Sequence, residues 1–124
     1  VATLEGLDVT AKAEFESLKA KLIPDVSKGL IDNKDEIVEA NLYAASMLGK
    51  KHASLLGSRF GFFVTDISKP VNNQFIADLI QTRASATCVI SLDVFEDQNA
   101  HALLSGHITR DGKYCLIAVI DISA

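Results

Sequence analysis

Residues 115–120 (CLIAVI) constrain the fold more than any other segment, because they are six apolar residues in a row. An antiparallel strand with one solvated face alternates apolar and polar residues, so an unbroken apolar run indicates a strand covered on both faces. The run follows Arg110-Asp111-Gly112-Lys113, and Asp-Gly is a preferred centre of a two-residue hairpin turn. The sequence therefore predicts an antiparallel hairpin whose second strand is buried on both sides.

The same turn predicts a register for the hairpin. A type I′ turn, with positive φ at both central residues, places Arg110 opposite Lys113. Counting outward from the turn pairs Thr109 with Tyr114, His107 with Leu116, Ser105 with Ala118 and Leu103 with Ile120. A shift of one residue would exchange the two faces of the strand, so these pairs also predict which side chains share a face.

Strand periodicity extends over the last third of the chain. We expect three strands over residues 87–95, 100–109 and 113–122, joined as an antiparallel meander. If the intervening loop at residues 96–99 places Phe95 opposite Ala100, the same count places Cys88 opposite His107.

Helical spacing dominates the first half. Thr10 is predicted to cap a helix that runs to Ile23, and Pro24 to end it or to open a short turn through residues 26–31. Asp32 or Asn33 is predicted to cap the next helix, whose buried side carries Val38, Leu42, Ala45 and Leu48. Gly49 is a predicted stop, and residues 50–56 add a further helical turn that Gly57 ends.

Two more elements precede the meander. Residues 60–65 (FGFFVT) are aromatic and β-branched, which predicts a short buried strand. Ser68 and Pro70 are predicted to begin a helix with Val71, Phe75 and Leu79 on its buried face. The predicted fold class is therefore α+β, a single domain over residues 1–124 with the helices packed on one face of a C-terminal antiparallel sheet.

Composition excludes several functional classes. The 124 residues are 48% hydrophobic, yet no apolar run reaches the ~18–20 residues of a membrane span, so we expect a soluble protein without a membrane partner. The formal net charge of −4 argues against nucleic acid as a partner. Cys88 and Cys115 are too few for a typical secreted disulfide scaffold, so we expect both to be reduced and buried, with a single disulfide between their strands as the alternative. No signal-peptide pattern opens the chain, and together these features predict a cytoplasmic protein.

The apolar terminal strand leaves one sheet face to be covered. Either the predicted helices divide between the two faces, or a second subunit covers one of them. We favour the second arrangement, a homo-oligomer, most simply a dimer formed through the C-terminal sheet.

Three residues are candidates for a ligand-binding site. His107 beside Cys88 could take the proton of the thiol and activate it as a nucleophile, provided that the assumed register holds. Asp66 follows the predicted 60–65 strand and precedes a helix, a position where polar side chains often face a ligand. His101 and His107 lie ~20 Å apart along one strand, too far to share a metal ion, and nothing in the sequence decides whether His52 approaches either of them.

The signatures of common enzymes are missing: GxGxxG, GxxxxGK[ST], HExxH, CxxC and GxSxG do not occur. We therefore expect a non-catalytic homo-oligomeric binding module without a cofactor or bound metal. The alternative is a small pocket enzyme that performs acid–base or thiol chemistry on an apolar small molecule, with Asp66 or His107 as the base and Cys88 as a possible nucleophile.

Overall fold

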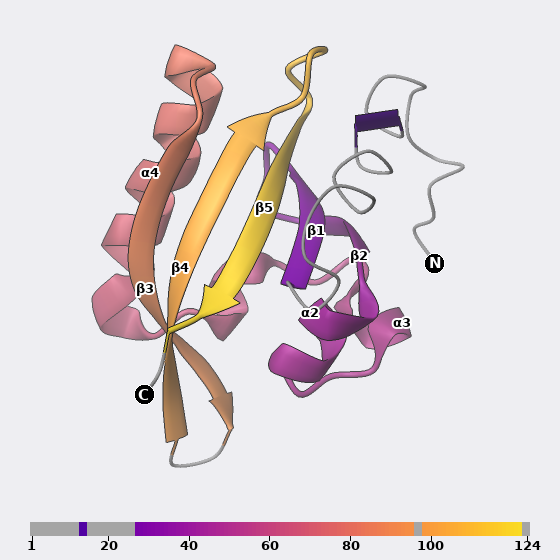
Figure 1. The fold of residues 1–124 in the computed structure, drawn as a ribbon, viewed down its shortest axis with the longest axis vertical. Helices are drawn as coiled ribbons and strands as arrows, with labels where there is room; N and C mark the ends of the chain where they lie inside the picture. The colour runs from indigo at the N-terminus through magenta and orange to yellow at the C-terminus, as the bar shows by residue number, and fades with distance from the viewer. Residues whose placement is uncertain (1–12, 15–26, 96–97, 123–124) are drawn as a thin grey trace.

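A five-stranded antiparallel sheet is the centre of the structure. The computed structural model describes residues 13–14, 27–95 and 98–122. In it, the sheet has the order β2-β1-β5-β4-β3, with bounds Ser27–Asp32 (β1), Ile37–Ala40 (β2), Ala86–Phe95 (β3), Gln98–Ile108 (β4) and Tyr114–Asp121 (β5). Helices accompany this sheet, as Figure 1 shows, so the α+β fold class is confirmed.

The predicted meander and hairpin register are both confirmed. Strand β4 pairs with β5 through Leu103–Ile120, Ser105–Ala118 and His107–Leu116, as the turn predicted. The N–H of Thr109 donates to the carbonyl of Tyr114 at 2.8 Å and closes the hairpin. The turn itself differs from type I′, because positive φ occurs at Gly112 (77°) but not at Asp111.

Strand β5 is central because β1 pairs with its other side. Gly29 lies opposite Ile117 and Leu30 opposite Leu116 in an antiparallel ladder. We predicted a turn at residues 26–31, and that prediction is wrong. The apolar run of β5 is thus flanked by strands on both sides, and its Cys115–Val119 segment is buried throughout.

The predicted helix from Asp32 or Asn33 is also wrong, because the chain turns back there as a β-hairpin. The Oδ1 atom of Asp32 accepts hydrogen bonds from the N–H groups of Lys34 and Glu36, at 2.8 and 3.0 Å, which favours a turn over a helix cap. Strand β2 follows, and Asn41 is the actual cap of a short helix α2 (Leu42–Met47), since its Oδ1 accepts from the N–H of Ala44 at 2.9 Å. Of the predicted buried side, Ala45 and Leu48 are buried, but Leu42 is exposed.

The segment between α2 and the long helix is built from short elements. Gly49 (φ 67°) follows α2, and α3 (His52–Leu55) is the predicted further turn, followed by Gly57 (φ 88°). Residues 60–65 do not form the predicted strand. They form a 3-10 helix, η2 (Phe60–Phe63), whose aromatic side chains Phe60 and Phe63 are buried, and only Val64 makes a strand-like bridge, with Leu92.

Helix α4 (Lys69–Thr82) is confirmed close to its predicted position, after a short 3-10 turn η3 (Asp66–Ser68). Its buried residues are Asn72, Phe75, Ile76 and Leu79, whereas the predicted Val71 is exposed. Gly106 of β4 allows the helix to approach the sheet, because a Cβ there would lie 3.0 Å from Phe75 Cζ and 3.1 Å from Leu79 Cδ1. Figure 1 shows α4 running alongside β3, with α2 and α3 near β2.

Two further predictions concern an N-terminal helix and the absence of membrane-spanning segments. The predicted helix over residues 10–23 lies outside the described residues except for Ala13 and Glu14, which are helical. Among the described residues, no helix has the length and apolar character of a membrane span.

Candidate functional site

A small apolar cavity lies between the inner face of the sheet and the short helices. It has a volume of about 40 Å3, and its wall combines β1, β2 and β5 with α2, α3 and η2. The lining residues are Lys28, Gly29, Ile31, Ile37, Ala40, Ala44, Leu48, Leu55, Phe60, Ile117 and Val119. Lys28 pairs with Ala118, next to the lining residues Ile117 and Val119, so strand alternation directs its side chain to the opposite face of the sheet. The cavity is therefore bounded by apolar side chains and backbone.

Small residues create this space. Gly29, Ala40 and Ala44 occupy positions where three elements converge on Leu55 and Phe60. Larger side chains at these three positions would fill a volume of this size, because a cavity of ~40 Å3 measured in this way holds only a few water-sized spheres. We did not predict this site from the sequence. The available signal was the recurrence of alanine at positions 40, 44 and 45 among larger apolar residues.

Asp35 fixes the wall of the cavity at Phe60. It occupies the β1–β2 turn with φ 67°, and its carbonyl accepts from the N–H of Phe60 at 2.9 Å. Its Oδ2 atom accepts from the N–H of Gly61 at 2.7 Å, while its Oδ1 atom is buried and has no hydrogen-bond partner among the described residues. The β1–β2 hairpin and η2 are thus joined through one residue beside the cavity.

Burial raises the pKa of the Asp35 carboxyl above its ordinary value. The hydrogen bond from Gly61 and the positive charge of Arg59 act in the opposite direction, and the charge of Asp32 adds to the rise. The neutral form of Asp35 is consequently favoured in the folded protein relative to the unfolded chain.

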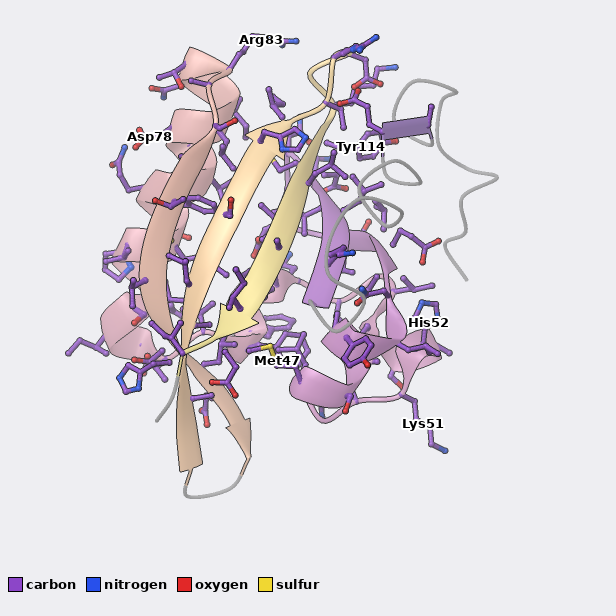
Figure 2. All side chains as sticks on the ribbon, in the orientation of Figure 1. Met47, Lys51, His52, Asp78, Arg83 and Tyr114 are labelled. Atoms are coloured by element: carbon purple, nitrogen blue, oxygen red, sulfur yellow. The ribbon has the colours of Figure 1, made fainter. Side chains whose placement is uncertain are left out.

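His52, the first residue of α3, connects this helix to strand β2 in the same region of the fold. Its Nε2 atom lies 2.7 Å from the carbonyl oxygen of Ala40 and 3.4 Å from Glu39 Oε1. Figure 2 shows His52 and Lys51 at the start of α3, beside β2. An open depression of about 560 Å3 extends from there over Tyr43.

The three residues predicted from the sequence are not brought together. Asp66 begins η3 with a fully exposed side chain, 3.3 Å from Lys69 Nζ. Cys88 lies opposite Leu104, not opposite His107. Phe95 pairs with Gln98 instead of Ala100, which shifts the β3–β4 register by two positions, and a bulge at residues 93–95 shifts it by one more, three in total. An odd shift exchanges faces, so Cys88 lies on the same face as Leu104, towards the helices, while His107 is on the outer face. The predicted thiol–imidazole pair is therefore wrong.

The histidines are likewise spread over the structure. His52 is on α3, and His101 and His107 are on β4. Within the described ranges, no three His, Cys, Asp or Glu side chains form a group that could hold a metal ion.

Known proteins share this fold without close sequence similarity. No family model matches the sequence, and neither does any curated protein sequence. The quorum-sensing receptor RpfR PAS domain of Cronobacter turicensis in complex with BDSF is similar over 83% of this chain and 99% of its own, with a TM-score of 0.71 and 10% identity. The Drosophila melanogaster Cycle PAS-B domain with bound ethylene glycol is similar over 77% of this chain and 99% of its own, with a TM-score of 0.69 and 8% identity.

A third similar structure is the Rhodobacter sphaeroides LOV protein. It has a TM-score of 0.72 and 20% identity, over 94% of this chain and 69% of that one. These similarities show that the chain has the fold of PAS and LOV domains.

Asp35 provides a test of how the cavity wall is held. Asp35→Ala removes the acceptor for the part-buried Gly61 N–H, so we expect it to lower the free energy of unfolding by about 1–3 kcal/mol. Asp35→Asn retains an acceptor and tolerates positive φ, so it should cost less. Urea denaturation of the three proteins measures both effects.

The pH dependence of the same variants follows from the raised pKa. The contribution of Asp35 is fully present below its unfolded pKa and is lost as the pH rises through the folded value, because the carboxyl must then ionise in a buried site. Relative to the wild type, Asp35→Asn should therefore gain stability between pH 4 and pH 7. An unchanged difference over this range would contradict the burial of the charge.

The thiol of Cys88 should be a poor nucleophile. Burial raises its pKa to about 11 from 9.0, so its thiolate fraction near neutral pH is about 100-fold below that of an unshifted thiol. We expect iodoacetamide to alkylate Cys88 in the folded protein with a rate that rises about tenfold per pH unit from pH 8 to 10. Peptide mapping by mass spectrometry separates Cys88 from Cys115, and urea-unfolded protein is the control. A rate that levels off near neutral pH would restore the thiol-enzyme hypothesis.

Proposed function

We propose that this chain is a non-catalytic ligand-binding module that holds a small apolar molecule in the cavity between the sheet and helices α2 and α3. The observation that carries the proposal is the lining itself, because the described side chains that face the cavity are apolar, Lys28 being directed to the opposite face of the sheet. A cavity of this kind stays dry and accepts apolar guests in preference to water. The structures of the same fold that contain BDSF and ethylene glycol support a binding role.

The size of the cavity limits its ligand. Pockets for drug-sized molecules have volumes of ~300–1,000 Å3, much larger than the space found here. In the observed conformation the cavity suits a guest of a few apolar atoms. A longer apolar ligand would require α2 and α3 to move away from the sheet, and these are short helices of six and four residues. Among the described lining residues, no polar side chain faces the cavity to orient a cofactor, so the proposal includes none.

Xenon is a suitable first probe because it is apolar and small. We expect the 129Xe NMR shift to report specific binding of xenon to the wild-type protein. In Ala44→Val this binding signal should be lost, because the added methyl groups enter the cavity. The matched control is Ala45→Val, at a neighbouring buried alanine that does not line the cavity. A second titration with straight-chain alcohols of increasing length, followed by amide NMR shifts, measures how far the cavity can open.

These outcomes are distinct. Xenon binding that persists in Ala44→Val, with the variant folded by circular dichroism, would place the guest elsewhere. The absence of binding by xenon and by every alcohol would contradict the proposal.

We also propose that the module forms a homodimer through the outer face of its C-terminal sheet. Val89, Leu103 and Ile120 are paired across β3, β4 and β5 and form an apolar row on this face. Val89 and Ile120 are 52% and 37% exposed, and Ile122 beyond them is 46% exposed. An exposed apolar row on a sheet face is typical of an interaction surface.

The dimer is tested by Ile120→Lys, which places a charge within the row. We expect sedimentation velocity to show the dissociation constant raised at least about tenfold, because an interface leaves such a charge unpaired. Asn73→Lys, at an exposed position of α4, is the matched control and should not change it. A monomeric wild type, or a dimer that tolerates Ile120→Lys, would contradict this interface.

Two other predictions are kept within the proposal. Both cysteines are free thiols, which supports a reducing, cytoplasmic location. Asp66, Cys88 and His107 stay predictions as ligand-binding residues, and none of the three is among the described residues that line the cavity.

A further inference from the structure

The free edge of β3 borders a surface groove that is separate from the cavity. This groove has a volume of about 390 Å3 and lies between α4 and β3. It is lined by Pro70, Val71, Gln74, Phe75 and Asp78 of the helix and by Ala86, Thr87 and Cys88 of the strand. Strand β3 is the last strand of the sheet on this side, so one row of its backbone groups faces away from β4.

The hydrogen bonds of Ser91 identify which backbone groups face the edge. Its carbonyl accepts from the N–H of Thr65 at 3.0 Å, and its N–H donates to Ser68 Oγ at 2.9 Å, both outside the sheet. In an antiparallel ladder alternate residues direct their N–H and C=O groups to the same side. Thr87 and Val89 therefore direct theirs outward as well. Within the described part of the chain, no group bonds to them there.

The chain itself demonstrates that this edge accepts an added strand. Val64 forms an antiparallel bridge with Leu92, and Thr65 bonds to Ser91, so a short extended segment already covers the C-terminal part of β3. The edge from Ala86 to Ile90 continues in line with that segment and borders the groove. The unpaired donors and acceptors recur every second residue, which is the spacing of a second strand.

The side chains that line the groove indicate which kinds of side chain an added strand would place there. Val71 is 44% exposed, and it lines the groove together with the ring of Phe75 and the half-buried Cys88. Asp78 also lines the groove, accepts from Gln74 Nε2 at 2.7 Å, and has no cationic partner among the described residues. Figure 2 labels Asp78 on α4 and Arg83 at the C-terminal end of the same helix.

We propose that the groove between α4 and β3 binds an extended peptide segment of a partner protein. The peptide adds to the Thr87–Val89 edge as a strand. It places an apolar side chain on Val71 and Phe75, and it pairs a basic side chain with Asp78. Strand addition beside a helix is an established mode of peptide recognition, in which backbone hydrogen bonds supply affinity and pockets supply specificity. A second copy of this chain fits less well, because its own β3 edge is flanked by α4, and two helices would meet at one interface. This proposal is independent of the cavity and of the sheet-face dimer.

Hydrogen exchange tests the free edge without any ligand. The amides of Thr87 and Val89 should exchange at rates near those of unfolded chain, whereas those of Cys88 and Ile90, which face β4, should be protected. Equal protection at all four amides would mean that the edge is already occupied and would overturn the proposal.

Binding is tested with a phage-displayed library of random seven-residue peptides selected against the whole chain. We expect enriched peptides to carry apolar residues at alternate positions and a Lys or Arg. Thr87→Pro removes one outward N–H without removing a sheet hydrogen bond, so it should weaken binding about tenfold or more. Thr87→Val keeps the N–H and is the matched control, and Asp78→Asn should weaken basic peptides about two- to fivefold.

A peptide measurement covers the case in which Thr87→Pro does not fold. N-methylation at one alternate set of peptide amides should abolish binding to the wild-type protein, while methylation of the other set is tolerated, because only one set faces β3. Any of three results would overturn the proposal: no peptide is enriched, the enriched peptides bind Thr87→Pro as tightly as the wild type, or both methylated sets of peptides bind equally well. Dissociation of the protein's own dimer by Thr87→Pro would assign the edge to a second copy and overturn it as well.

Discussion

The pairing of β5 with both β1 and β4 is the interaction on which the rest of the structure depends. It places an uninterrupted apolar strand at the centre of the sheet, where Cys115–Val119 are buried. On the inner face, Ile117 and Val119 form the floor of the cavity, and Gly106 of the neighbouring strand lets Phe75 and Leu79 of α4 approach. The ladder with β1 brings Gly29 beside that floor and fixes the position from which the β1–β2 turn, with Asp35, reaches η2.

The two halves of the inner face are covered in different ways, and this difference separates the two proposed sites. Over β3 and β4 a fourteen-residue helix packs with large side chains, and a groove lies at its outer margin. Over β1 and β2 the described cover consists of two short helices and a 3-10 turn, which contribute Ala44, Leu55 and Phe60 to the cavity lining. Individual hydrogen bonds that involve Asp35, Asn41 and His52 hold these elements in place. The cavity lies under the second cover because small side chains and short elements fill space less completely.

Local sequence patterns predicted the elements that have strong local signals. The remaining elements depend on tertiary contacts that the sequence pattern does not show. The β4–β5 register followed from its short connection, although the turn type did not. The β3–β4 register failed because Phe95 pairs with Gln98 instead of Ala100, and because a bulge between Asp93 and Phe95 has no distinct signature. Strand β2 was missed because Val38, Leu42, Ala45 and Leu48 imitate helical spacing across a strand and a helix. Strand β1 was missed because Pro24 indicated a turn over residues 26–31. The apolar lining of the cavity was visible only as candidate core, since a sequence pattern does not show where packing is incomplete.

The position of β5 in the chain also determines the order in which the sheet can be completed. Its partners are β4, joined by a short turn, and β1, whose Leu30 pairs with Leu116 at a separation of 86 residues (116 − 30). During synthesis every other strand leaves the ribosome before the central one, so β1 and β2 must wait as a hairpin without their neighbour. Folding of this chain therefore ends at the middle of its sheet, and pairing over such a distance makes that step slow.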